Sequence, residues 1–106
     1  MSAKPVEALE IVQADLEYAR SFYESWKPGG GEEILRKYFE AVEWIEWNPD
    51  LFPTKFGIIQ RVILKRSYFV VYFLQEETRS IILAVLDGRR DPRVIHKLIS
   101  RRRESV

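Results

Sequence analysis

The sequence contains no cysteine and only one histidine, His96. Without cysteine neither a disulfide nor a thiolate metal site can form, and one histidine cannot build a multi-histidine site. No apolar run approaches the roughly 18–20 residues of a bilayer-spanning helix, and the first five residues lack the apolar core of a signal peptide. These absences predict a cytoplasmic protein that does not associate with membranes and carries no metal or other cofactor.

Charge is nearly balanced overall but is divided between the two halves of the chain. The formal net charge is +1 over 106 residues. Residues 1–50 carry five Lys/Arg and eleven Asp/Glu, whereas residues 51–106 carry twelve and five, so the halves have net charges of −6 and +7. One surface can therefore attract a polyanion while the protein stays almost neutral. Equally, both sets of charges could be solvated faces that pair with each other.

Three apolar runs predict the sheet: Ile58–Leu64, Tyr68–Leu74 and Ile81–Leu86. Each has six or seven residues and is dominated by residue types that favour strands. Because the connections between them are short, an antiparallel meander is the simplest topology. Pro5–Glu10 is a weaker candidate for an additional edge strand.

A helical hairpin is predicted before the meander. Apolar residues at helical spacing run from Val12 to Trp26, and Pro28 with Gly29–Gly31 ends this first helix in a turn. A second helix is predicted from about Glu32 to Trp47, with Ile34, Leu35, Tyr38, Phe39, Val42 and Ile45 on its buried face.

After the meander, Val94–Ser100 is predicted as a short C-terminal helix and Arg101–Arg103 as a frayed basic tail. The predicted fold class is therefore α+β. A helical hairpin packs on a small antiparallel sheet, and a short helix follows. Residues 1–106 are expected to form one domain.

The last two strands lack the alternation of a sheet with one wet face. In the run Phe69–Leu74 and again in Ile81–Leu86, apolar side chains point to both sides. We therefore expect a partner segment or a second copy of the chain to cover the second face. The alternative is that the C-terminal segment folds back and closes the sheet alone.

The strongest candidate site is a set of six cations near the ends of the strands. They are Arg61, Lys65, Arg66, Arg89, Arg90 and Arg93. Adjacent antiparallel strands run in opposite directions, so the first turn and the exit of the last strand should share one end of the sheet. Guanidinium groups there suit nucleic acid or an acidic protein surface, and the nearby Tyr68 could contact a nucleobase. Alternatively, Asp87 and Asp91 neutralise these cations in a surface ion-pair network.

The chain resembles the RelE/ParE superfamily of toxins from bacterial type II toxin–antitoxin pairs, most closely its ParE-like, plasmid-stabilisation branch. The resemblance rests on the order of several short pieces. They are Ala14-Asp15-Leu16, Phe22-Tyr23-Glu24, Pro28-Gly29-Gly30-Gly31, Asn48-Pro49 with Phe52-Pro53, Leu64-Lys65-Arg66, Val70-Val71-Tyr72-Phe73, Leu83-Ala84-Val85-Leu86 and Gly88-Arg89-Arg90-Asp91-Pro92-Arg93.

The resemblance implies a toxin neutralised by a cognate antitoxin, with a homodimer possible when the antitoxin is absent. ParE-like toxins poison DNA gyrase without hydrolysing anything. RelE-like toxins instead cleave mRNA on the ribosome, where Arg89 and Arg90 would stabilise the transition state and Tyr68 would stack on a base. Phe69 stands where RelE-like nucleases carry Arg, and Asp87 stands where ParE-like sequences often carry His. Whether the chain is an enzyme therefore stays open, and an inactive binding module with the toxin fold is a third alternative.

Overall fold

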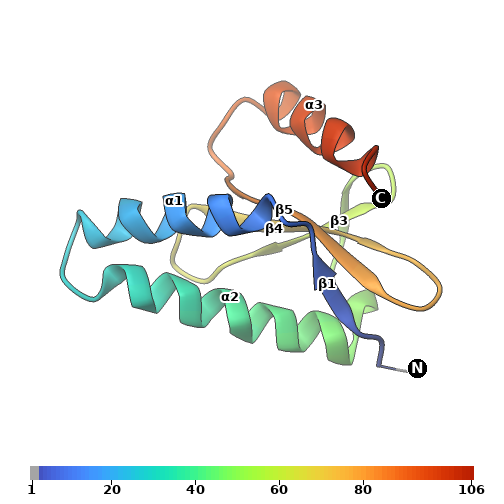
Figure 1. The fold of residues 1–106 in the computed structure, drawn as a ribbon, viewed down its shortest axis with the longest axis horizontal. Helices are drawn as coiled ribbons and strands as arrows, with labels where there is room; N and C mark the ends of the chain where they lie inside the picture. Colours follow the sequence, from blue (N-terminus) through green and yellow to red (C-terminus); the bar gives the residue numbers. More distant parts are fainter. Residues whose placement is uncertain (1–2) are drawn as a thin grey trace.

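The computed structural model describes residues 3–106, which form three layers (Figure 1). Two helices cover one face of a five-stranded sheet, and a third helix lies on the other face. The predicted α+β class, with its helical hairpin and C-terminal helix, is confirmed. The elements in chain order are β1 (Val6–Ala8), α1 (Val12–Glu24), α2 (Gly30–Trp47), the 3-10 helix η1 (Pro49–Leu51), β2 (Thr54–Phe56), β3 (Ile59–Ile63), β4 (Phe69–Gln75), β5 (Ser80–Asp87) and α3 (Pro92–Arg103).

The sheet has the strand order β1-β5-β4-β3-β2. Its three long strands form the predicted antiparallel meander, with Val62 opposite Val71 and Val71 opposite Val85. The weaker prediction of an N-terminal edge strand is also confirmed, but β1 runs parallel to β5, with Val6 opposite Ser80. The sheet is therefore mixed, because long connections separate β1 from β5 and no tight turn forces them to be antiparallel.

Glu24 fixes the turn between the first two helices. Its carboxylate accepts hydrogen bonds from the N–H groups of Gly29 (3.2 Å) and Gly31 (3.0 Å) at the start of α2. Gly29 has a φ of 86°, a left-handed conformation that favours glycine, and a Cβ on Gly30 would collide with the backbone of α1. As a result, α2 begins two residues earlier than predicted, and α1 ends before Trp26.

The larger core lies between the helical hairpin and the sheet. Alternate residues of β4, from Phe69 to Phe73, face this core, as the period of a strand requires. Phe39 was expected on the buried face of α2. It is exposed instead, because the side of α2 that carries Phe39 points away from the sheet. The buried members of this core are Val12, Ala19, Ile34, Tyr38, Ala41, Ile45, Leu64, Phe69, Val71, Phe73, Ile82 and Val85.

A second core lies between α3 and the opposite face of β4 and β5. Ile95 and Ile99 of α3 are almost completely buried there, against residues such as Tyr72 and Leu83. The expectation that a partner must cover this face of β4 and β5 is therefore wrong, and the C-terminal segment closes it. The helix achieves this because it spans 12 residues, which is longer than predicted.

A buried ion pair fastens the end of α3 to α1. The guanidinium of Arg102 donates to both carboxylate oxygens of Asp15, at 2.5 and 2.9 Å, and to the carbonyl of Leu83 at 3.1 Å. Asp15 also accepts from the N–H of Val85 at 2.9 Å, so both oxygens of its carboxylate are hydrogen-bonded. Residues 101–103 are therefore part of α3, and the predicted frayed tail is wrong.

Candidate functional site

The first turn of the meander and the exit from its last strand meet at one end of the sheet, as predicted. Phe69, the first residue of β4, lies opposite Asp87, the last residue of β5. One step further, the N–H of Gly88 donates to the carbonyl of Tyr68 at 2.7 Å. A Cβ on Gly88 would come within 2.7 Å of Val70, so glycine permits this close approach. The residues after β5 are thereby placed directly beside Tyr68.

Arg89 stacks on Tyr68 at this end of the sheet. Its guanidinium carbon lies 3.7 Å from the centroid of the Tyr68 ring, and the same group donates to Asp87 at 2.7 and 3.0 Å. This hydrogen bonding lowers the pKa of Asp87 and raises that of Arg89. The Tyr68 backbone is held in turn, because its N–H donates to the Tyr23 hydroxyl at 2.8 Å. Asp87 and the Tyr68 ring therefore hold the Arg89 side chain in one orientation, while about half of that side chain stays exposed to solvent.

Arg90 lies on the connection between β5 and α3, and Arg93 is the second residue of α3, but neither stacks on an aromatic ring as closely as Arg89 does. The Arg90 guanidinium lies 5.9 Å from the ring centroid of Tyr18, on α1. Arg93 donates to Asp91 at 2.7 Å, and this pairing lowers the pKa of Asp91. The Arg93 side chain is nevertheless 91% exposed. Two of the three arginines therefore pair with neighbouring carboxylates, as the ion-pair alternative expected, but none of them is buried.

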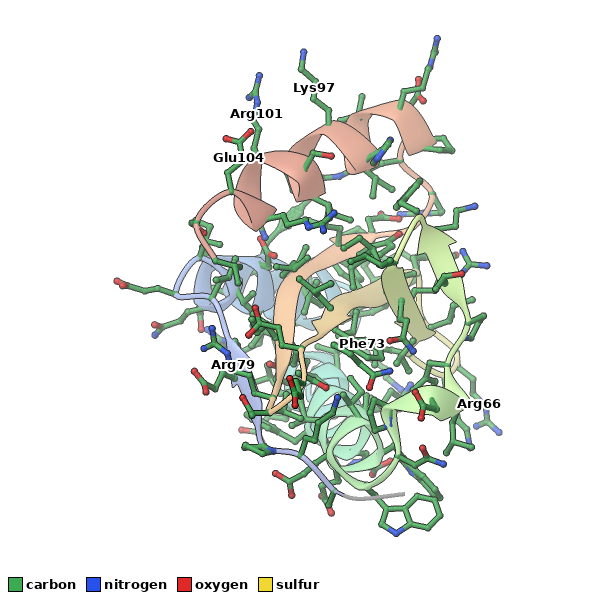
Figure 2. The ribbon with its side chains drawn as sticks, turned by 90° about the vertical axis from the view of Figure 1, so that its right-hand side faces the viewer. Arg66, Phe73, Arg79, Lys97, Arg101 and Glu104 are labelled. Carbon is green, nitrogen blue, oxygen red and sulfur yellow. The ribbon has the colours of Figure 1, made fainter. Side chains whose placement is uncertain are left out.

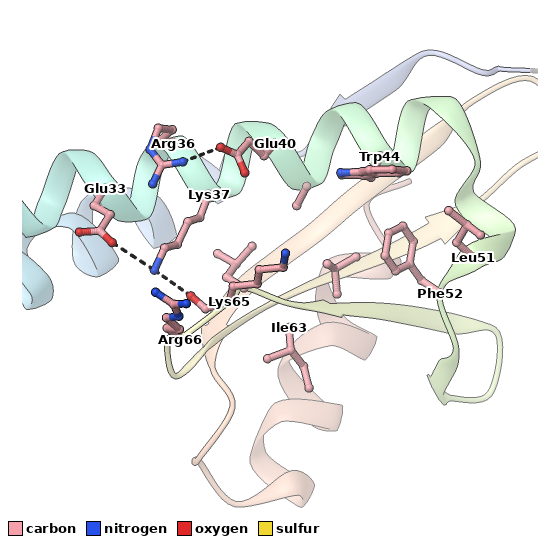
Figure 3. Close-up of a pocket in the computed structure, with 13 residues that line it drawn as sticks. Glu33, Arg36, Lys37, Glu40, Trp44, Leu51, Phe52, Ile63, Lys65 and Arg66 are labelled. Atoms are coloured by element: carbon pink, nitrogen blue, oxygen red, sulfur yellow. Dashed lines mark hydrogen bonds and ion pairs between the residues drawn. The ribbon is translucent and has the colours of Figure 1, made fainter.

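The remaining three cations occupy other surfaces. Lys65 and Arg66 belong to the β3–β4 turn, where Arg66 adopts a φ of 54°, and both line a groove beside α2 (Figure 3). Arg61 lies opposite Tyr72, inside β3 and on the face that α3 covers. The structure therefore brings Arg89 and Arg90 together with Tyr68, places Lys65 and Arg66 in the adjacent groove, and separates Arg61 from the end of the sheet.

Sequence reasoning missed the aromatic surface beneath these arginines. Tyr18, Phe22 and Trp26 recur every four residues, so α1 and the turn after it carry them on one side. Phe22 lies 5.8 Å from the Arg89 guanidinium, and Trp26 packs edge-on against Tyr68 with 6.0 Å between the ring centroids. The four-residue spacing of these aromatic residues was visible in the sequence. It was not recognised as a second stripe, because the apolar stripe through Val12 and Ala19 already accounted for the buried face of α1.

This arginine–aromatic site, defined by Arg89, Arg90, Tyr68, Phe22 and Trp26, has the chemistry of a binding surface. Guanidinium groups over aromatic rings present charge and a flat apolar area together, which suits carboxylates, phosphates or planar groups. Within residues 3–106, no cluster of three His, Cys, Asp or Glu side chains could hold a metal ion. Nor does the described part of the chain contain a helix long and apolar enough to cross a bilayer.

A second surface feature is the groove between α2 and β3, with a volume of about 510 Å³ (Figure 3). Its walls are apolar near Trp44, Leu51 and Phe52, and basic near Lys65 and Arg66. The groove lies on the helical-hairpin side of the β3–β4 turn. The two cations that the sequence grouped with Arg89 thus belong to a different surface.

Comparisons with known proteins agree with this architecture. A family model described as the ParE toxin of the type II toxin–antitoxin system parDE matches residues 6–92. A solved structure described as the chromosomal ParDE system from P. aeruginosa has a TM-score of 0.68 and 16% identity, and the alignment covers 78% of this chain and 94% of that chain. At this identity the structural match shows a shared fold. Comparison with curated protein sequences gives no significant match. The family model spans most of the chain, and this protein therefore belongs to the ParE toxin family of type II toxin–antitoxin systems.

Proposed function

We propose that this protein is the toxin of a ParDE-type pair, which inhibits DNA gyrase and is neutralised by its cognate antitoxin. The observation that carries the proposal is the family match over residues 6–92, which includes the helical hairpin, every strand of the sheet, and both Arg89 and Arg90. The target contact is assigned to the arginine–aromatic site. We place Arg93 at its margin, because Arg93 is the second residue of α3 and directly follows the connection that carries Arg89 and Arg90.

The chemistry of this site favours binding over catalysis. Asp87 is ionised at neutral pH and its carboxylate is engaged by Arg89, so it is poorly suited to act as a general acid. The single histidine, His96, is stacked on Phe56 of β2 with 4.8 Å between the ring centroids. Arg90 forms no ion pair among residues 3–106, so it can bind a carboxylate or phosphate of a target without first losing a partner.

Expression of the toxin without antitoxin tests this proposal. We expect growth arrest with filamentation and DNA damage, because a poisoned gyrase leaves breaks in DNA. The variant Arg89→Ala with Arg90→Ala should lose toxicity while keeping its fold, since both side chains lie on the surface. Lys97→Ala with Arg101→Ala is the matched control. Both side chains point away from the sheet on the outer side of α3 (Figure 2), so this variant should remain toxic.

Each other outcome contradicts part of the proposal. Rapid arrest of translation with cleaved mRNA would identify a ribosome-dependent endoribonuclease instead. Undiminished killing by the folded Arg89→Ala, Arg90→Ala variant would show that the target contacts a different surface. Normal growth during expression of the folded, soluble wild-type chain would identify a non-toxic binding module.

A further inference from the structure

The uneven distribution of charge along the chain becomes an uneven distribution in space. α2 carries five Glu and two Lys/Arg, whereas α3 carries five Lys/Arg and no Asp or Glu. These two helices lie on opposite faces of the sheet (Figure 1). Of the ion pairs among residues 3–106, only Arg79–Glu7 and Arg102–Asp15 join the two halves of the chain. The molecule therefore has an acidic side and a basic side that leave each other largely unneutralised.

The basic side is organised as a stripe along the outer face of α3. Arg93, Lys97 and Arg101 are spaced by four residues and are all exposed, so they lie along one side of the helix. Ile95 and Ile99 turn the opposite side of the helix toward the sheet. Accordingly, Lys97 and Arg101 point away from the sheet (Figure 2). With a rise of about 1.5 Å per residue, the stripe is about 12 Å long.

Most of the positive charge of this stripe is uncompensated. Lys97 and Arg101 form no ion pair with any residue in the described range. Arg93 pairs with Asp91, but its side chain stays 91% exposed. Glu104, the C-cap residue of α3, is the next carboxylate along the chain. An anion that approaches the outer face of α3 therefore meets two cations that have no partner to release.

Cations of β2 and β3 extend the same basic side. Arg61 lies opposite Tyr72, on the face of the sheet that α3 covers. The Lys55 ammonium lies 5.8 Å from the ring centroid of Phe56, which in turn stacks on His96 of α3. Neither Arg61 nor Lys55 forms an ion pair among residues 3–106. Arg61, which the structure separates from the arginine–aromatic site, thus belongs to this second cationic surface.

A nucleic-acid backbone matches the stripe better than a protein or a lipid surface does. Within α3, all of which the structure describes, Val94 is the only large apolar side chain that is exposed, whereas a protein interface has an apolar core. The apolar face of α3 is buried against the sheet, so it is not available to enter a bilayer. A DNA duplex carries one negative charge per about 1.7 Å of its axis, so a length equal to the stripe holds about seven phosphates.

The composition and position of α3 favour duplex DNA among nucleic acids. α3 contains no Phe, Tyr or Trp on which an unpaired base could stack. It forms the outer layer on its side of the molecule (Figure 1), and a helix with its side chains is about 10–12 Å across. The major groove of B-form DNA is about 12 Å wide, whereas that of A-form RNA is too narrow to admit a helix.

We propose that the outer face of α3 is a DNA-binding surface, on which Arg93, Lys97 and Arg101 contact the phosphates of a duplex without reading its sequence. The family match ends at residue 92, the first residue of α3, so the stripe lies outside the part of the chain that the match covers. Lys97 and Arg101 also lie outside the arginine–aromatic site. The inference is therefore independent of the proposed gyrase inhibition, and mutation should separate DNA binding from toxicity.

Fluorescence anisotropy with the full chain and a labelled duplex of about 20 base pairs, of arbitrary sequence, tests this surface at about 50 mM salt. Lys97→Ala with Arg101→Ala should raise Kd at least about tenfold. The slope of log K against log salt should fall in magnitude by about two, because each lost phosphate contact lowers it by about one. Lys27→Ala with Arg36→Ala is the matched control. It removes two cations from the helical hairpin, so the net charge changes equally, but Kd should change by less than about twofold.

A variant expected to bind more tightly guards against effects of misfolding. Glu104→Gln removes the carboxylate at the end of the stripe and should lower Kd, a gain that loss of structure cannot produce. Absence of wild-type binding, or equal weakening by the two double variants, would overturn the proposed surface. Equal binding of duplex RNA would overturn the choice of DNA, and binding to phosphatidylglycerol vesicles without binding to DNA would identify a lipid surface instead. Toxicity is measured separately, so each of these results leaves the proposed function standing.

Discussion

Replacement of Arg102 by methionine should destabilise this protein far more than its place in a run of three arginines suggests. Arg102 makes two hydrogen bonds to Asp15 and one to the carbonyl of Leu83, and its side chain is only 14% exposed. Arg102→Met would leave the Asp15 carboxylate buried with one remaining donor, the N–H of Val85.

Removing one partner of a buried ion pair costs about 3–5 kcal/mol, because the remaining charge is neither solvated nor paired. A domain of this size has a total stability of about 5–15 kcal/mol, so the loss is a large part of the whole. The double variant Asp15→Leu with Arg102→Met removes both charges and should recover much of the loss. The two substitutions are therefore strongly non-additive.

Urea denaturation followed by circular dichroism measures these changes as shifts in the free energy of unfolding. The control is Arg101→Met, one residue away, which points from α3 into solvent (Figure 2) and should change the free energy of unfolding by less than about 0.5 kcal/mol. A loss of less than about 1 kcal/mol for Arg102→Met would refute the reasoning. Such a result would mean that the ion pair behaves as an exposed one and does not fasten α3.

Two further predictions concern the core and the helical turn. Burial raises the pKa of Tyr72, so the unfolded chain ionises first and stability should fall as the pH rises above about 10, the ordinary tyrosine value. Urea midpoints between about pH 9 and 11 should show a smaller fall for Tyr72→Phe than for wild type, and equal falls would count against this origin. Gly30→Ala should destabilise the fold by about 1–3 kcal/mol, because its Cβ would collide with the carbonyl of Tyr23. Thermal unfolding checks this, and an unchanged Tm would show that the turn has room to relax.

The meander and the helical hairpin were predictable because their signals are local. Strand-length runs of Val, Ile, Tyr and Phe led to β3, β4 and β5 within one or two residues of their ends. The end of α1 and the start of α2 were harder to predict from the sequence. They depend on the Glu24 cap and on the close packing of Gly30, which are contacts between the two helices.

The Asp15–Arg102 pair could not be found from the sequence, because the partners are 87 residues apart and each looks like a surface charge in its own helix. For the same reason the closure of the second sheet face by α3 was treated as the alternative. The helix start did carry a local signal: Asp91 accepts a hydrogen bond from the Arg93 N–H, and Pro92 is the first helical residue.

The candidate site was predicted in part. The meander topology placed Arg89 and Tyr68 together, since two antiparallel strands must bring a turn and an exit to the same end. The same reasoning grouped Arg61 with them, but a residue inside a strand projects from a face of the sheet rather than from its end. The aromatic side chains of α1 beneath the arginines required the position of that helix over the sheet, which strand topology alone does not determine.

Inhibition of purified DNA gyrase tests the central claim most directly. Relaxed plasmid is incubated with gyrase, ATP and increasing amounts of the toxin, and the supercoiled and cleaved products are separated on agarose gels. The account predicts loss of supercoiling with accumulation of cleaved DNA. It also predicts relief by the antitoxin and no inhibition by the Arg89→Ala, Arg90→Ala variant. Unimpaired supercoiling in the presence of excess folded toxin would contradict it.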